Sequence, residues 1–173
     1  MSYRDYSIFR SVEELKMHID VLNEVLIVTS GGFDPLHIGH LRCIRESAEI
    51  VRKKKNVREK RLKLAVIVNG DGFLYRKKGK PFMPEAERLE IIAGIDGVDY
   101  IVPWDDGSQT VIGAINILRP IAFTKGGDRD SASNVAEFDI CNEVGCEVIF
   151  GVGGGKIQSS SWLIESSANV SKN

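Results

Sequence analysis

The chain has 173 residues, of which 43% are hydrophobic and 27% charged, and its formal net charge is −1. This length suits one domain that buries its own core, and a net charge near zero does not favour a nucleic-acid partner. Three cysteines without paired metal-ligand spacing, no signal sequence and no apolar run of roughly 20 residues lead us to expect a cytoplasmic protein without a membrane segment.

Residues 1–24 precede the first predicted strand, and we interpret them as an N-terminal extension of a single domain over residues 25–173. Ser11 followed by Val-Glu-Glu-Leu predicts an N-cap and a helix with Leu15, Ile19 and Leu22 on one face. Packing of this helix on the outside of the sheet is the simplest interpretation. A dimer contact or a substrate lid is the alternative, which leaves a homodimer open.

The stretch after this extension predicts a strand, a tight turn and a helix. Val25 to Thr29 is rich in β-branched residues, as in a strand buried on both faces. Gly31 and Gly32 allow a sharp turn. If the helix starts near Leu36, two histidines three positions apart, His37 and His40, share a face beside its unpaired N–H groups. Such a helix start suits a polyphosphate.

The sequence GGFDPLHIGH, which contains this turn, resembles the HxGH signature of nucleotidyltransferases. Five further stretches resemble, in the same order, the pattern of the cytidylyltransferase-like branch: AVIVNGD at 65–71, KKGKPFMPEAER at 77–88, VDYIVPWDD at 98–106, TKGGDRD at 124–130 and SSSWLI at 159–164. Within that branch the chain is most similar to adenylyltransferase domains that make ADP-heptose, and next to glycerol-3-phosphate cytidylyltransferases. The resemblance covers roughly residues 24–168.

Eight basic residues and one acidic residue occupy the segment RKKKNVREKRLK at 52–63. We expect a solvated helix extension or loop here, because charge runs are usually exposed. Attraction of an anionic substrate or polymer is the alternative, although the segment has no interleaved aromatic residues of the kind that bind nucleic acids.

A second strand is predicted from Leu64 to Val68, and Asp71 follows at its carboxyl end, where open α/β sheets bind ligands. Asp71 either contacts the acceptor or a metal, or only terminates the strand. The next segment, Gly72–Pro84, predicts a flexible basic loop that closes over phosphates, with Lys78 and Lys80 as candidates. An ordinary exposed loop is the alternative.

In the helix after this loop, the resemblance implies that Arg88 faces the nucleotide phosphates. A surface salt bridge with Glu85 or Glu87 is the competing account. Replacing Lys78 or Arg88 by methionine is expected to damage turnover but to leave the melting temperature nearly unchanged, because exposed charges contribute little to stability.

Tyr100 to Val102 predicts a third strand, after which Asp105 and Asp106 are expected to cap a helix over Gln109–Leu118 and to take no part in catalysis. Ile121 to Thr124 predicts a fourth strand that ends in Lys-Gly-Gly-Asp. The two glycines would let the backbone lie against a base or ribose, and Asp128 could accept hydrogen bonds from hydroxyl groups. A plain tight turn is the alternative.

Ser133 is expected to cap a helix over Val135–Glu143, and Glu147 to Phe150 predicts a fifth strand. Three glycines at 153–155 then lead to three serines at 159–161, which predict the cap of the last helix and a second phosphate contact. Serines stand here where the family usually has threonines. The arginine that follows these serines in nicotinate-mononucleotide adenylyltransferases is missing.

Together these features predict one α/β domain with a Rossmann-like, doubly wound sheet of five parallel strands. The resemblance implies the strand order 3-2-1-4-5 and transfer of a nucleoside monophosphate, with AMP favoured over CMP, from a nucleoside triphosphate with Mg²⁺ to a small sugar or polyol phosphate. The expected catalytic residues are His37, His40, Lys78 and Arg88. The expected nucleotide-binding residues are Gly32, Phe33, Asp34, Gly39, Lys125, Gly127, Asp128, Ser159, Ser160 and Ser161. Asp71 and Lys80 are expected to bind the acceptor, and no metal ligand is assigned.

A phosphate nucleophile is anionic near neutral pH, so this reaction needs charge neutralisation and alignment more than a general base. A CTP-dependent enzyme for glycerol 3-phosphate or a similar monoester is the nearest alternative, and a nucleotide sensor without turnover is the non-enzymatic one. An aminoacyl-tRNA synthetase is disfavoured, because the chain has no KMSKS-like loop and no room for an anticodon domain.

Overall fold

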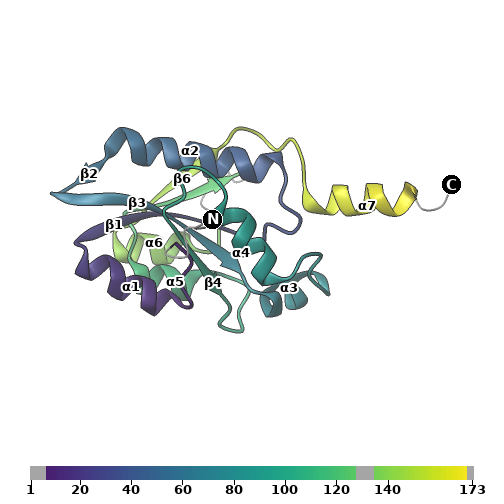
Figure 1. The fold of residues 1–173 in the computed structure, drawn as a ribbon, viewed down its shortest axis with the longest axis horizontal. Helices are drawn as coiled ribbons and strands as arrows, with labels where there is room; N and C mark the ends of the chain where they lie inside the picture. Colours follow the sequence, from purple (N-terminus) through teal and green to yellow (C-terminus); the bar gives the residue numbers. More distant parts are fainter. Residues whose placement is uncertain (1–6, 128–134, 171–173) are drawn as a thin grey trace, which may run out of the picture.

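Parallel strands form the centre of the protein, for which we have a computed structural model that describes residues 7–127 and 135–170. Their order across the sheet is β4-β3-β1-β5-β6 (Figure 1). The bounds are β1 Glu24–Gly31, β3 Lys60–Asn69, β4 Tyr100–Trp104, β5 Ala122–Gly126 and β6 Glu147–Val152. Counted along the chain, these parallel strands have the order 3-2-1-4-5, which confirms the predicted topology.

The sheet also contains a short antiparallel strand that the sequence did not predict, β2 (Asn56–Val57). It pairs with the first residues of β3, so the described part of the sheet has six strands instead of five. Arg58 and Glu59 form the two-residue turn between the strands, and both have positive φ, as a type I′ hairpin turn requires. Glycine or asparagine usually marks such turns, and neither is present at these two positions.

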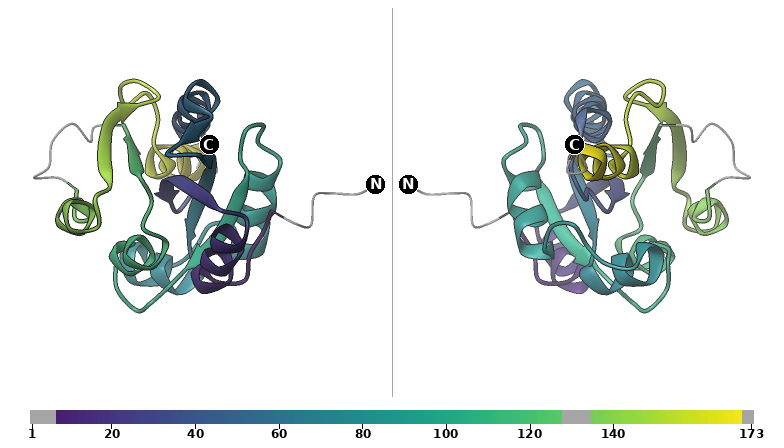
Figure 2. Two further views of the ribbon diagram at one scale, coloured as in Figure 1. Left: turned by 90° about the vertical axis from the view of Figure 1, so that its left-hand side faces the viewer. Right: turned by 90° about the vertical axis from the view of Figure 1, so that its right-hand side faces the viewer.

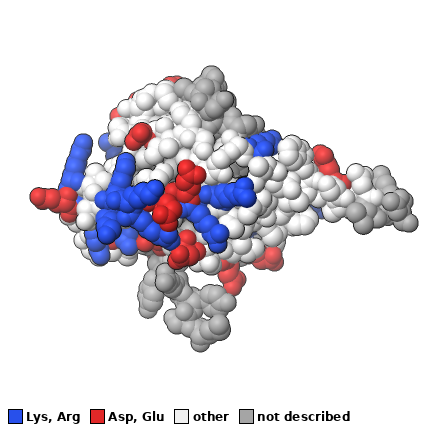
Figure 3. Space-filling model, turned by 90° about the horizontal axis from the view of Figure 1, so that it is seen from above, with Lys and Arg blue, Asp and Glu red and all other residues white. Residues whose placement is uncertain are grey.

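The basic segment at residues 52–63 is therefore the end of a helix and a hairpin, and the prediction of a helix extension or loop was incomplete. Figure 3 shows lysine and arginine side chains gathered on this surface, with acidic side chains between them. Arg52 pairs with Glu49 and, at 2.9 Å, with Asp96. Part of the positive charge is thus neutralised locally, as expected for a solvated face.

Helices cover both faces of the sheet (Figures 1 and 2). One face packs against α1 (Val12–Val21), α5 (Ile112–Leu118) and α6 (Phe138–Val144). The other packs against α2 (Ile38–Lys54) and α4 (Glu85–Ala93). Successive strand residues alternate between the two cores, because side chains along a strand point to opposite faces. The sheet is therefore doubly wound, with its ligand-binding edge at the carboxyl ends of the strands.

The N-terminal extension shares this core. The Ser11 hydroxyl accepts a hydrogen bond of 3.2 Å from Glu14 N, which caps α1 as predicted. Val12, Leu15 and Ile19 are buried against the sheet and α5, at roughly 1.5–3 kcal/mol for each side chain. Leu22, predicted on the same face, is 40% exposed instead. The helix packs on the outside of the sheet, as the simplest interpretation held.

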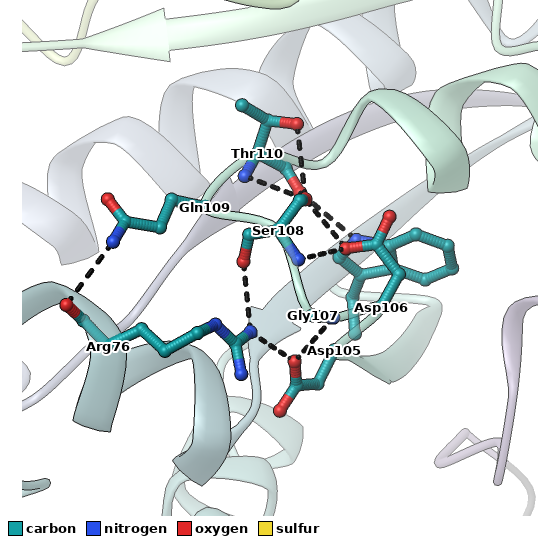
Figure 4. Close-up of polar contacts among 8 residues, drawn as sticks. Arg76, Asp105, Asp106, Gly107, Ser108, Gln109 and Thr110 are labelled. Atoms are coloured by element: carbon teal, nitrogen blue, oxygen red, sulfur yellow. Dashed lines mark hydrogen bonds and ion pairs between the residues drawn. The ribbon is translucent and has the colours of Figure 1, made fainter.

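Two local predictions were wrong. The expected loop Gly72–Pro84 begins as a helix, α3 (Asp71–Lys78), so the flexible connection is shorter than predicted. The helix predicted from Gln109 starts only at Ile112, and neither aspartate before it caps it. Asp105 pairs with Arg76 of α3, and Asp106 accepts a hydrogen bond from Ser108 N at 3.0 Å (Figure 4). The aspartates therefore stabilise the preceding turn.

At the C-terminal end, α7 (Ser160–Val170) extends away from the body of the domain (Figure 1). The helix expected over Val135–Glu143 starts at Phe138, and its expected cap, Ser133, lies outside the described residues. Within the described ranges, no helix is both long and apolar enough to cross a lipid bilayer.

Candidate active site

A cavity of about 520 Å³ opens at the carboxyl ends of the parallel strands. The turn after β1, the start of α2, the end of β5 and the segment between β6 and α7 all contribute to its wall. Nine of the predicted site residues line it: Gly32, Phe33, His37, Gly39, His40, Lys125, Gly127, Ser159 and Ser160. These residues come from separate stretches of sequence, and the sheet topology brings them together.

The two histidines form the start of α2. His37 is the N-cap residue, and its Nδ1 accepts a hydrogen bond of 3.1 Å from Gly39 N. The Nδ1 of His40 accepts one of 3.3 Å from His37 N, and the two rings stack with centroids 3.7 Å apart. Because both Nδ1 atoms accept, the neutral rings carry their proton on Nε2. Each imidazole therefore has one N–H donor that the helix cap does not use.

Both histidines favour the neutral state. Burial lowers the pKa of His37 below its ordinary value. Burial, together with the neighbouring His37, lowers the pKa of His40 from 6.5 to about 4. Near neutral pH these side chains are thus hydrogen-bond donors and not cations.

Two glycines allow this geometry. A Cβ atom on Gly39 would lie 3.0 Å from the ring of His37, and one on Gly32 would lie 2.9 Å from Leu74. Both distances are below ordinary carbon–carbon contact, so a larger residue would displace the N-cap ring or the turn. The HxGH spacing is thus a packing requirement as well as a chemical one.

The start of α7 lies beside the start of α2. Ser160 donates a hydrogen bond of 2.8 Å from its hydroxyl to the carbonyl oxygen of Pro35. Ser159 caps the helix by accepting one of 3.2 Å from Trp162 N, as predicted. Ser161 contacts the Ser159 hydroxyl at 3.1 Å but does not line the cavity. Two helix starts therefore approach the same space.

Asp34 and Lys78, both predicted in the site, form an ion pair outside the cavity wall, in which Asp34 is buried and Lys78 is exposed. The ammonium of Lys78 lies 2.5 Å from the Asp34 carboxylate and 2.7 Å from its carbonyl oxygen. Burial alone would raise the pKa of Asp34, but Lys78 and the N–H groups of Phe82 and Met83 hold it below its usual value. Lys78 is exposed, as predicted, but it is the last residue of α3 instead of lying in a loop, and its ammonium is paired with Asp34.

Arg88 is fully buried, with 0% of the residue exposed. Its guanidinium donates to the carbonyl oxygens of Gly32, Asn69 and Met83 at 2.5 to 3.0 Å, and it pairs with Asp71 at 2.7 Å. The prediction of an exposed cation, whether facing phosphates or pairing with Glu85 or Glu87, is therefore wrong. Arg88 connects the turn after β1, the end of β3 and the start of α3.

At the end of β5, the ammonium of Lys125 lies 3.6 Å from the carboxylate of Glu137 and 4.4 Å from the ring centroid of Phe123. Glu137 also accepts a hydrogen bond of 3.2 Å from Val111 N, just before α5. Asp128, predicted to contact the ribose, lies outside the described residues. The predicted acceptor residues Asp71 and Lys80 do not line the cavity.

The cavity also contains side chains that the sequence did not indicate: Cys43, Asn69, Lys77, Gln109 and Glu137. Asn69 ends a predicted strand, so the topological rule that selected Asp71 could have selected it too. The family resemblance selected Lys78 and not its neighbour Lys77, whereas Lys77 is the one that lines the cavity. Burial raises the pKa of Cys43, so its thiol is not an activated nucleophile.

A model of the family described as cytidylyltransferase-like matches residues 28–155. The chain belongs to this family. Similar curated proteins are the bifunctional protein HldE of a Nitratiruptor species, 29% identical over 138 residues, and that of Methylococcus capsulatus, 32% identical over 127 residues. These alignments cover 79% and 72% of this chain, but only 27% and 24% of the relatives. The chain thus spans about a quarter of the length of these relatives.

A solved structure with the same fold is the lipopolysaccharide core biosynthesis protein from Thermoplasma volcanium GSS1. It superposes with a TM-score of 0.55 at 22% identity, over 78% of this chain and 97% of that chain. This match supports the α/β fold alone. The family match makes the chain an enzyme of the cytidylyltransferase-like nucleotidyltransferases.

Proposed function

We propose that the chain transfers a nucleoside monophosphate from a nucleoside triphosphate to the phosphate of a small sugar or polyol phosphate. An acceptor oxygen forms a bond to the α-phosphorus, the bond from that phosphorus to the β-phosphate oxygen breaks, and pyrophosphate leaves. The observation that carries this proposal is the pair of neutral histidines at the start of α2, each with an Nε2–H donor left over from the helix cap. Donors placed beside a helix N-terminus suit a polyphosphate.

These donors would stabilise charge that builds on the phosphoryl oxygens in the transition state. A neutral imidazole can bind the triphosphate through hydrogen bonds, and these bonds become stronger as negative charge grows. The backbone fixes both rings in advance, so little reorganisation is needed. The helix starts of α2 and α7 position the nucleotide, and the acceptor phosphate needs no base because it is already anionic.

Mg²⁺ belongs to this proposal as part of the nucleotide substrate. Across residues 7–127 and 135–170, no group of three or more histidine, cysteine or acidic side chains could hold a metal ion. Magnesium commonly binds through substrate phosphates and water.

ATP is the favoured nucleotide, because curated relatives at about 30% identity are HldE proteins and the Lys-Gly-Gly-Asp segment resembles adenylyltransferase domains. The family description favours CTP as the second candidate.

Pyrophosphate release with each of the four common nucleoside triphosphates and Mg²⁺ tests this proposal. The acceptors should be mannose 1-phosphate, a heptose 1-phosphate, glycerol 3-phosphate, ethanolamine phosphate and choline phosphate. We expect acceptor-dependent release with ATP and a sugar or polyol phosphate. A preference for CTP would overturn the adenylyl assignment, and nucleotide binding without pyrophosphate release with any of these acceptors would overturn the proposed acceptor class.

A further inference from the structure

The strand order divides the cavity into two halves. His37, His40, Lys125 and the serines of α7 lie around the ends of β1, β5 and β6. On the other side of β1, the wall comes from the end of β3, from α3 and from the residues before α5, with these lining residues: Asn69, Phe73, Lys77, Gln109 and Val111. The nucleotide proposed above uses the first half, so a second substrate has the second half available.

Asn69 is the unusual residue of this second half. It is only 6% exposed, and its Oδ1 is buried with no hydrogen-bond partner among the described residues. An unsatisfied buried acceptor costs about 1–3 kcal/mol, so fold stability does not explain it. The last torsion of an asparagine is broad and roughly two-fold, so the carboxamide can turn its oxygen toward a ligand in the cavity. An acceptor atom of this kind matches a hydroxyl donor.

The same half of the cavity offers a cation. Lys77 lines it, with its ammonium 5.9 Å from the ring centroid of Phe73, and it forms no ion pair within the described ranges. Its neighbour Lys78 is held by Asp34. Lys77 can therefore reach a phosphate without breaking an ion pair.

The opposite wall is fixed by the turn before α5. Figure 4 shows Gln109 donating from its amide to the carbonyl oxygen of Arg76, at 3.2 Å, while the guanidinium of Arg76 holds Asp105 and the carbonyl oxygen of Ser108. These contacts attach the turn to α3, so α3 and the turn frame one rigid space. A rigid wall is what discrimination between similar small molecules requires.

Charge in the cavity decides the class of acceptor. Glu137 is the acidic side chain that lines the cavity in the described part of the chain, and Lys125 neutralises it at 3.6 Å. An ammonium group on the acceptor would find no uncompensated anion among these described lining residues. Hydroxyl groups, in contrast, match the free acceptor on Asn69.

We propose that this second half of the cavity is the acceptor subsite, in which Asn69 recognises a hydroxyl group of an uncharged polyol or sugar and Lys77 binds its phosphate. This assignment rests on the nucleotidyl transfer proposed above. It replaces Asp71 and Lys80, which do not line the cavity, as the acceptor residues.

The experiment compares matched acceptors in wild type and in Asn69→Leu. Glycerol 3-phosphate is paired with propyl phosphate, and mannose 1-phosphate with its 2-, 3-, 4- and 6-deoxy analogues, at saturating ATP. A site built to bind a hydroxyl rejects an analogue that lacks it, so wild type should prefer a hydroxylated acceptor by roughly 10²-fold or more in kcat/KM. In Asn69→Leu this preference should fall below about tenfold, while KM for ATP changes by less than about twofold.

Two further variants control for structural damage. Asn116→Leu makes the same substitution at an exposed position of α5 and should change neither ratio. Because the Asn69 oxygen has no partner to lose among the described residues, Asn69→Leu should keep or raise the melting temperature. Asn69→Ala has a smaller side chain that cannot clash. It should show the same loss of preference, which would exclude distortion of the cavity by leucine as the cause.

Three results would overturn the assignment. They are an unchanged preference in both Asn69 variants, a rise in KM for ATP instead of loss of acceptor preference, and faster turnover with ethanolamine or choline phosphate than with polyol phosphates. If wild type turns over no acceptor at all, the proposed function fails first. If wild type is active and Asn69→Leu behaves like it, only the subsite fails.

Discussion

The first turn of α2 and the cluster around Arg88 both place polar side chains at the same edge of the sheet, but they differ in what remains available. Each histidine uses one ring nitrogen for the helix cap and keeps the other. Arg88 donates to three carbonyl oxygens and pairs with Asp71, with no surface exposed. Both matched the same family pattern. A polar side chain that matches such a pattern is therefore a candidate for catalysis only when it keeps a hydrogen-bonding group that the protein itself does not use.

The largest expected effect concerns the histidines. His37→Ala and His40→Ala should each lower kcat by roughly 10²-fold or more, with little change in KM for the nucleotide, because the lost hydrogen bonds strengthen in the transition state. Each variant also loses a capping bond, at about 1 kcal/mol, so the melting temperature must be measured alongside. His18→Ala, outside the cavity in α1, is the matched control and should stay active. Full activity in both cavity variants would remove the mechanism.

The second prediction concerns the buried cluster around Arg88 and the variant Arg88→Met. Loss of four buried or half-buried hydrogen bonds should lower the free energy of unfolding by roughly 3 kcal/mol, and the melting temperature by about 10 °C. Arg58→Met, in the exposed hairpin turn, should shift it by very little. Differential scanning calorimetry of both variants and of the wild type would measure these shifts in melting temperature. If Arg88→Met lost turnover but kept its free energy of unfolding, Arg88 would act on the nucleotide phosphates instead of stabilising the fold.

The smallest effect concerns pH. The pKa of His40 is about 4 in the folded protein against 6.5 ordinarily, so the unfolded state binds a proton first as the pH falls. The stability contributed by neutral His40 is complete above pH 6.5 and is lost between about 6.5 and 4, with a loss of about 1 kcal/mol near pH 5.5. Urea unfolding at several pH values should show this decline. His40→Asn, which can still accept at the cap, should flatten it in that window, and an equal slope in both proteins would contradict the assignment.

Local sequence patterns predicted the five parallel strands in their order along the chain and a helix start just after β1, but they missed β2 and α3. Val25 to Thr29 could only be a buried strand, because its β-branched residues suit a sheet covered on both faces. The turn before His37 predicted a helix that starts near Leu36, and α2 starts at Ile38 with His37 as its N-cap. These features depend on contacts between residues close in the chain.

Only the tertiary structure decided which charged residues face the cavity. The family resemblance singled out Lys78, but the turn of α3 directs Lys77 to the cavity and Lys78 to Asp34. Arg88 is buried because three carbonyl oxygens from distant segments surround it, and Asn69 is unpartnered because none of the described residues reaches its oxygen. Local propensity cannot specify such contacts, since they arise only when separate elements pack together.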